Sequence, residues 1–424
     1  MGTGRLNGAP FIFLPSQKAF AADLTCIHHR CLVYTSAMTT TNQNPDPVEA
    51  LAAAEFPVAE RHIYLNHAAI SPWPERARRA MRGFVDGITE DGSLHFPDWQ
   101  EMDGRLRERF RELLNAPSTD PIALVPNTSV GLSLVAAGMD WQSGDNVVIT
   151  DSEFPSNRMP WEALRDQGVE VREARADSAC EDNILALVDE RTRVVSVSSV
   201  QFGTGLATDL ERLGRELAGT PTAFCVDAIQ SLGAFPFDAQ AIGADFVAAD
   251  GHKWMLGPEG LGVFYCAPEW LDRLTLHQWG WHMADPFGDF DARQWQPAAN
   301  ARRFEPGTPN TPSNHALEAS LSLLQEVGID EVGARIGARV AHLIEGLGAL
   351  PQAEFLSPTD PTRRAGIVTV RFGDRTETVY EALRAQNVQV LPRAGGIRFA
   401  PHFYNRFSGL DQVIQVASEA LGRD

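Results

Sequence analysis

A lysine and an aspartate each follow a short apolar segment in this chain. Asp227 comes directly after residues 222–226, and Lys253 comes shortly after residues 245–249. Both segments have the apolar composition of buried strands. In open α/β sheets the carboxyl ends of parallel strands face one crevice. The sequence therefore predicts an amine and a carboxylate in one site at the edge of an α/β sheet.

Three further predicted strands also end in groups that suit a ligand. Thr128 and Ser129 open a helix, where hydroxyls and free N–H groups bind phosphate. Phe154 offers a ring for stacking, and Gln201 offers an amide. Taken singly, Thr128 and Ser129 are more often only a helix N-cap and Phe154 is more often a core aromatic, while Lys253 is as often an exposed lysine. Together, five such strand ends favour a ligand site.

The five groups match what pyridoxal phosphate (PLP) requires of a protein. A lysine amine holds the PLP aldehyde as a Schiff base, and an aspartate keeps the pyridine nitrogen protonated, so that the ring accepts electrons. We therefore expect PLP as the cofactor, with Lys253 and Asp227 as the catalytic residues.

Seven motifs between Tyr64 and Asn405 resemble those of the class V aminotransferases. This family includes cysteine desulfurases, kynureninases, isopenicillin N epimerase-like proteins and C–S lyases. The resemblance implies the PLP-dependent transferase fold, an α/β fold like that of aspartate aminotransferase. The motifs lie at residues 64–69, 153–157, 199–202, 226–230, 251–254, 305–310 and 396–405.

The resemblance also implies roles for single residues. Lys253 would form the aldimine and then move the α-proton, giving a quinonoid, with Asp227 at the ring nitrogen. The other implied cofactor contacts are Thr128, Ser129, Phe154, Gln230, His252 and, from the neighbouring subunit of a homodimer, Thr308. The implied substrate contacts are Asn66, His67, Ala68, Gln201 and Arg398, whose guanidinium would bind the α-carboxylate as a bidentate fork.

This chain departs from the family pattern at several positions, and these differences help to predict which reaction it catalyses. Phe154 stands where cysteine desulfurases carry a histidine, and a phenyl ring cannot transfer protons. The loop 392–397 lacks the desulfurase cysteine, which argues against a persulfide relay. Asp250 replaces a small hydroxyl residue near the phosphate, and we expect its side chain to point away. Transaminase or C–S lyase chemistry on an α-amino acid is favoured. A kynureninase-like hydrolase, an amino-acid epimerase and a non-catalytic PLP-binding protein remain open.

The net charge and composition of the chain argue against some classes of binding partner. A net charge of −19 argues against nucleic acid or an anionic membrane as a partner, and no apolar run has the length of a membrane span. Five scattered cysteines favour reduced thiols in the cytoplasm. We expect a small-molecule amino-acid substrate and a second copy of the chain as the partners.

We expect three regions along the chain. Residues 1–60 form an N-terminal extension and arm, with 1–37 disordered. Residues 61–310 form a large PLP-binding domain with a mainly parallel sheet wrapped by helices, and residues 311–424 form a small α+β domain that opens with a helical stretch at 316–348. The cysteines and histidines at 26–31 do not have a standard zinc spacing, so no metal is expected.

Overall fold

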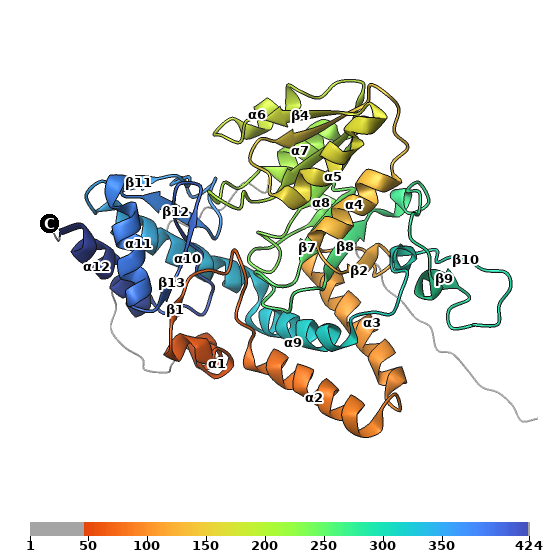
Figure 1. The fold of residues 1–424 in the computed structure, drawn as a ribbon, viewed down its shortest axis with the longest axis horizontal. Coiled ribbons are helices and arrows are strands. Elements are labelled where there is room, and N and C mark those ends of the chain that lie inside the picture. The colour runs from red at the N-terminus through yellow and green to blue at the C-terminus, as the bar shows by residue number, and fades with distance from the viewer. Residues whose placement is uncertain (1–45, 423–424) are drawn as a thin grey trace, which may run out of the picture. The chain divides into compact units, whose positions relative to one another are not determined.

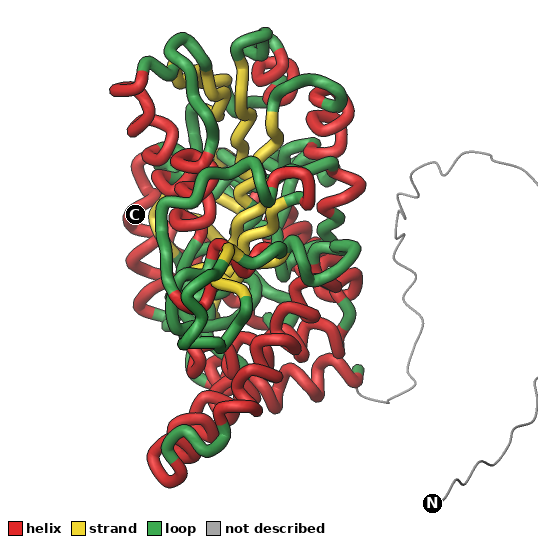
Figure 2. The backbone as a smooth tube through the Cα atoms, turned by 90° about the vertical axis from the view of Figure 1, so that its right-hand side faces the viewer, coloured by secondary structure: helices red, strands yellow, loops and turns green. Residues whose placement is uncertain are grey.

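A seven-stranded sheet forms the centre of the computed structural model, which describes residues 46–422. Helices cover both sides of this sheet (Figures 1 and 2). Six strands run parallel, and only β8 is antiparallel to its neighbours β2 and β7. The expected α/β class with a mainly parallel sheet is confirmed. The strands are, across the sheet, β2 (Ile122–Val125), β8 (Gly262–Cys266), β7 (Phe246–Asp250), β6 (Ala223–Asp227), β5 (Thr192–Ser198), β3 (Asn146–Thr150) and β4 (Glu170–Ala174).

Strands β6 and β7 are buried along their whole length. Such burial on both faces explains why they read as continuous apolar runs rather than as alternating patterns. Their parallel register sets Asp227 opposite Ala248. The ends of both strands, and the residues that follow them, therefore meet at one edge of the sheet.

Short helices connect the strands of this sheet. Asn127, Asp209 and Asp238 each cap a helix by accepting a hydrogen bond from a backbone N–H of its first turn. The capped helix that follows β2 is α4, so its N-terminus lies beside the carboxyl ends of the parallel strands. The connecting helices are α4 (Thr128–Gly138), α5 (Met159–Glu162), α6 (Cys180–Leu185), α7 (Leu210–Leu217) and α8 (Ala239–Ile242).

Longer helices form a second layer, in which α9 packs along α2 and α3 (Figure 1). The expected helical stretch at 316–348 consists of two helices, because Gly328 has φ +88° and separates α9 from α10. A left-handed glycine commonly ends a helix. These helices are α1 (Pro47–Glu55), α2 (Glu75–Asp91), α3 (Phe96–Leu113), α9 (Thr311–Val327) and α10 (Ile329–Gly348).

A smaller antiparallel sheet lies in the C-terminal part of the chain. Its strands are, in order, β11 (Glu354–Phe355), β12 (Val368–Arg371), β15 (Gly396–Phe399) and β14 (Leu391–Arg393). The helices α11 (Thr376–Ala385) and α12 (Phe407–Gly422) pack against each other here. The separate β1 (Ile63–Tyr64) pairs with β13 (Val388–Gln389), and β9 (Ala284–Asp285) with β10 (Gln296–Pro297).

The backbone of Leu65 joins this C-terminal part to the segment that precedes α2. Its N–H donates to the carbonyl of Gln389 (2.9 Å), and its carbonyl accepts from the N–H of Ala400 (2.7 Å). The predicted large domain thus begins with a segment that pairs with the predicted small domain. The boundaries at residues 60 and 310 stay predictions.

Two expectations of absence concern the same described range. Within residues 46–422, no helix has the length and hydropathy needed to cross a membrane. The same residues contain no group of three or more His, Cys, Asp or Glu side chains arranged to hold a metal ion. The Cys26–Cys31 segment lies outside the described residues.

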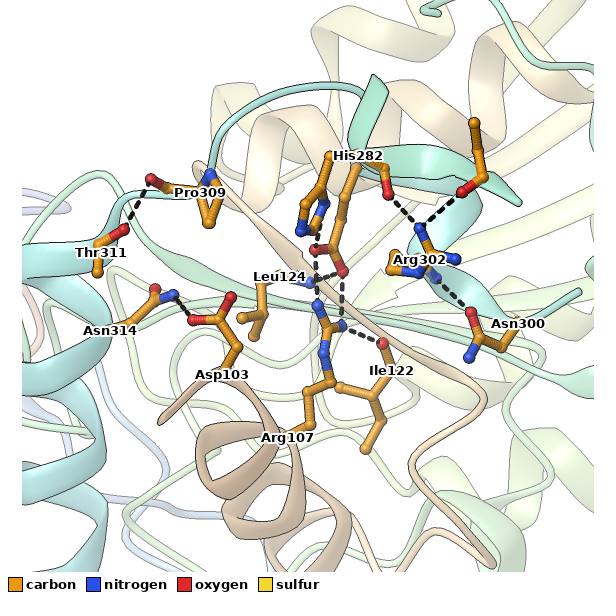
Figure 3. Close-up of polar contacts among 12 residues, drawn as sticks. Asp103, Arg107, Ile122, Leu124, His282, Asn300, Arg302, Pro309, Thr311 and Asn314 are labelled. Atoms are coloured by element: carbon orange, nitrogen blue, oxygen red, sulfur yellow. Dashed lines mark hydrogen bonds and ion pairs between the residues drawn. The ribbon is translucent and has the colours of Figure 1, made fainter. Parts of the chain in front are cut away.

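A buried ion pair ties α3 to the segment that follows β10 (Figure 3). Arg107 donates through both terminal nitrogens to the Glu305 carboxylate, at 2.6 and 2.7 Å, and also to the carbonyl of Ile122. Glu305 accepts a further bond from the N–H of Leu124 (2.9 Å). Because both strand β2 and helix α3 depend on this carboxylate, it stabilises the edge of the sheet from which α4 begins.

Replacing Glu305 by Gln should leave the Arg107 guanidinium buried without a counter-charge. Breaking a buried pair in this way costs about 3–5 kcal/mol. We expect the free energy of unfolding to fall by that amount, measured by urea denaturation. The control is Glu354→Gln, which removes the exposed partner of Arg371 and should change stability little. Equal effects of the two substitutions would contradict the role given to Glu305.

Candidate active site

A cavity of about 300 Å³ opens at the carboxyl edge of the central sheet, beside the N-terminus of α4. Most of the residues named from the sequence line it together, although they come from five separate strand ends and from the C-terminal sheet. The site residues that the structure brings together are Ala68, Thr128, Ser129, Phe154, Asp227, Gln230, His252, Lys253 and Arg398.

Lys253 is the only lysine after Lys18, although lysines and arginines together number 36. It is 7 % exposed, and its Nζ lies 5.4 Å from the centroid of the Phe154 ring. Burial lowers the pKa of Lys253 to about 8; the charge of Asp227 opposes this shift and that of Arg398 adds to it. The side chain is therefore an amine that becomes neutral near pH 8, which a guanidinium does not.

Asp227 ends β6 and is 1 % exposed. Its Oδ1 accepts a hydrogen bond from the N–H of Ile229 at 3.0 Å. Burial raises the pKa of Asp227 to about 7, while this hydrogen bond and Lys253 lower it. A buried carboxyl in this state is held ionised only by a further N–H or cationic partner.

The start of α4 is built to accept an anion. Asn127 caps the helix through the N–H of Val130 (2.9 Å), and the Ser129 hydroxyl donates to Ser156 Oγ (2.7 Å). The hydroxyl of Thr128 is buried and has no hydrogen-bond partner among the described residues. An unpaired buried hydroxyl costs free energy, and the helix N-terminus attracts negative charge. Both observations fit a phosphate here.

Asp250 and His252 occupy the same end of the cavity. Asp250 Oδ1 lies 2.9 Å from His252 Nδ1, and neither atom makes a well-oriented hydrogen bond within the described chain. The expectation that the Asp250 side chain points away is wrong, because the residue lines the cavity and contacts His252.

Arg398 is 2 % exposed yet has no carboxylate partner within residues 46–422. Its Nη1 donates to the carbonyl of Phe202 at 2.7 Å, its Nη2 lies 3.5 Å from Asn66 Oδ1, and its Nε has no partner. Burial, and then the neighbouring Arg393, lower the pKa of Arg398 to about 10. An anionic ligand would supply the missing counter-charge.

The structure does not bring Asn66, His67 or Gln201 to the cavity lining. His67 is fully buried, with Nδ1 at 2.7 Å from the carbonyl oxygen of Ala400 and Nε2 at 2.8 Å from the hydroxyl of Tyr404. Burial lowers the pKa of His67 to about 4. Gln201 Oε1 accepts from the N–H of Gly203 (2.7 Å). In this conformation the side chains of His67 and Gln201 hold the backbone of other segments.

Thr308 lies in a second cavity, of about 280 Å³, that shares no lining residue with the first. Its apolar side is formed by Phe96, Trp99, Trp281 and Phe287. Thr308, which the resemblance assigns to the phosphate site of a neighbouring subunit, therefore does not line the first cavity of its own chain.

Several cavity residues were not named as site residues from the sequence. Phe202 packs edge-on against Phe154, with ring centroids 5.2 Å apart. Ala69 and Ser156 lie inside motifs that had been recognised, so their neighbours could have indicated them. The full set of additional lining residues is Ala69, Asn127, Ser156, Phe202, Ile229, Asp250 and Arg393.

Fold and cavity together define an α/β protein that holds one amine, one buried carboxyl and an anion-binding helix start at the carboxyl edge of its sheet. The family model Aminotransferase class-V matches residues 63–409, and the chain belongs to this family. The resemblance inferred from the seven motifs is confirmed.

Relatives and solved structures agree with this assignment. A probable cysteine desulfurase of Methanothermobacter thermautotrophicus is 33 % identical, over 87 % of this chain and 96 % of its own length. The uncharacterized aminotransferase YcbU of Bacillus subtilis is 28 % identical, over 86 % and 96 %. The apo cysteine desulfurase of Thermococcus onnurineus NA1 shares the fold with a TM-score of 0.77, at 22 % identity over 90 % of this chain and 99 % of its own.

A second solved structure has the same fold. The cystine C–S lyase C-DES, in complex with cysteine persulfide, has a TM-score of 0.79 at 24 % identity, over 86 % of this chain and 99 % of its own.

The lowered pKa of Lys253 predicts unusual reactivity of its amine. After bound aldehydes are removed with hydroxylamine, acetylation of Lys253 should rise with pH and reach half its maximum near pH 8, because about half of the amine is then neutral. Asp227→Asn should shift this midpoint to lower pH, since the Asp227 charge favours the protonated amine. Peptide mass spectrometry measures both. A midpoint near that of a free lysine peptide would show that the amine is solvated.

Proposed function

We propose that the protein is a PLP-dependent enzyme that acts on an α-amino acid. One observation carries the proposal: a chain that uses arginine almost everywhere for positive charge keeps one lysine after residue 18, and that lysine is buried in the cavity beside a buried aspartate. Schiff-base chemistry needs a primary amine whose pKa can be lowered, which explains the choice of lysine.

The residues present fit the cofactor. Thr128, with its unpaired buried hydroxyl, and the N-terminus of α4 would hold the phosphate, and the phenyl ring of Phe154 would face the pyridine ring. Asp227 would accept a hydrogen bond from the protonated ring nitrogen and so gain the partner that its burial demands. When bound, PLP supplies an electron sink for the carbanion formed at the α-carbon.

The chain's own side chains would divide the remaining work. The Lys253 amine, neutral near pH 8, can accept the α-proton at Nζ and return it. Arg398 would bind the α-carboxylate and so orient the α-carbon toward that amine. Phe154 cannot transfer a proton, so Lys253 would act as the only general base among the cavity residues that face the α-carbon.

C–S lyase chemistry on a sulfur-containing amino acid is the reaction class that we favour. Relatives are named cysteine desulfurases, but Cys180, Cys225 and Cys266 are fully buried, and burial raises the pKa of each thiol, that of Cys180 to about 12. None of these three is a competent thiolate. Elimination without a protein persulfide fits better, and transamination, for which Lys253 and Arg398 suffice, is the second candidate.

We further propose a cytoplasmic homodimer. The free thiols of Cys180, Cys225 and Cys266 agree with a reducing compartment. The aromatic cavity that contains Thr308 has large exposed side chains, among them Phe96, Trp281 and Phe287, which a second copy of the chain would cover. In that arrangement Thr308 would reach the partner's phosphate site.

Borohydride reduction of the protein loaded with PLP tests the central claim. We expect one reduced pyridoxyl adduct, on the peptide that contains Lys253, and loss of the visible absorbance. Lys253→Arg is the matched control, because it keeps a cation but has no primary amine; it should give no adduct. An adduct on Lys18, or on the control variant, would disprove the assignment.

Asp227→Asn tests the electron sink separately. The variant should still bind PLP, seen by absorbance, but turn over substrate about a hundredfold more slowly or worse, because a pyridine ring without an ionised partner at its nitrogen stabilises the carbanion poorly. The control is Asp245→Asn, a buried carboxyl that precedes β7 and bonds to Phe224 and Trp270 instead. It should affect stability only. An unchanged turnover rate in Asp227→Asn would show that Asp227 has only a structural role.

A further inference from the structure

A tight hairpin brings a second arginine to the cavity. Strands β14 and β15 are joined by Ala394 and Gly395, which have φ +51° and +85°. Positive φ at both central residues is typical of a two-residue type I′ turn, whose geometry sets the register of the hairpin. Arg393 is thereby paired with Gly396.

This register places both arginines of the hairpin on one face. Leu391 pairs with Arg398, and Arg393 pairs with Gly396. Side chains alternate between faces along a strand, so Arg393 and Arg398 point to the same side as diagonal neighbours, within reach of long side chains. Both line the cavity that contains Lys253.

The two guanidinium groups differ in burial but share a lack of acidic partners. Arg398 is buried, whereas Arg393 is exposed at the rim, and its side chain makes only a 3.4 Å hydrogen bond to the carbonyl of Pro392. Within residues 46–422 neither forms an ion pair, although most arginines there do. Like charges on one face of a hairpin repel each other. An anion that bridges this face would remove that cost.

The two acidic residues that line the cavity, Asp227 and Asp250, do not supply a counter-charge for the hairpin arginines. Asp227 lies at the end of β6, and Asp250 contacts His252 at the end of β7. Neither is in contact with the hairpin arginines. The cavity is therefore divided into a mixed-charge end at the central sheet and a purely cationic end at the hairpin.

We propose that Arg393 binds a second anionic group at the far end of the substrate's side chain, so that the substrates are α-amino acids, sulfur-containing in the favoured reaction, whose side chain ends in a second carboxylate. This inference rests on the proposed function, in which Arg398 takes the α-carboxylate. Since Arg393 lies nearer to solvent than Arg398, the second anion would lie toward the cavity mouth, where the side chain of a bound amino acid extends. A single-carboxylate substrate such as cysteine would leave Arg393 unpaired.

Calorimetric measurement of the affinities of simple carboxylates for the PLP-loaded protein tests whether Arg393 binds a second anion. Succinate, glutarate and adipate are each compared with the monocarboxylate of equal chain length, which offers one anion and the same apolar stem. At least one dicarboxylate should bind about fivefold more tightly than its match, as a largely exposed ion pair allows, and added salt should weaken this preference.

Arg393→Gln should bring the ratio of the two affinities close to one. The matched control is Arg384→Gln, an exposed arginine on α11 outside the cavity lining, which should keep the wild-type ratio. A ratio near one in the wild-type protein, or a preference that survives in Arg393→Gln, would show that Arg393 is a solvated surface arginine. Failure to take up PLP at all would refute the proposed function instead, so the two failures are distinguishable.

Discussion

The rest of the site depends on the burial of one ammonium group beside one carboxyl group. Removing both from water raises the pKa of Asp227 and lowers that of Lys253, so each moves toward its neutral form. Their mutual attraction opposes both shifts. The pKa of the Lys253 amine is lowered toward neutral pH as a result, and a general base needs this property.

The parallel sheet is what keeps these two groups together. Asp227 lies opposite Ala248 in a parallel register that also pairs Cys225 with Phe246 and Val226 with Val247, and both strands are buried on each face. A slip of one residue would turn every side chain to the other face. The packing of the apolar runs thus determines the position of the polar groups that follow them.

Sequence reasoning succeeded where local pattern and position in the sheet coincide. The strands are continuous apolar runs, so their ends, and with them Asp227, Lys253, Thr128 and Phe154, could be placed at one edge. It failed for His67, which belongs to a recognised motif but turns inward to Ala400 and Tyr404. That contact joins residues more than three hundred positions apart, and no local pattern reports it.

Arg393 illustrates a different limit. Its nearness to Arg398 depends on a two-residue turn in which Ala394, a residue that rarely adopts positive φ, sits in the left-handed region. The sequence shows that the loop is short, but it does not give the backbone conformation of Ala394, and that conformation fixes which face Arg393 points to. Likewise Asp250 was expected to avoid the phosphate end, because repulsion was weighed without the His252 imidazole that lies 2.9 Å away.

The separation of charge within the cavity has a consequence for how a substrate lies in it. The central sheet contributes every acid, together with Lys253 and His252, while the C-terminal hairpin contributes only arginines. An amino acid whose amino group lies toward Lys253 and whose carboxylate lies toward Arg398 matches this distribution of charge. In the reverse orientation neither end of the amino acid would match it.

The backbone holds the cationic end of the cavity in place. Strand β15 leads directly into Ala400, whose N–H bonds to Leu65, so backbone hydrogen bonds as well as side chains hold this end to the segment that precedes α2. Orientation of the substrate therefore depends on this backbone contact between Ala400 and Leu65 as much as on the residues that touch the substrate.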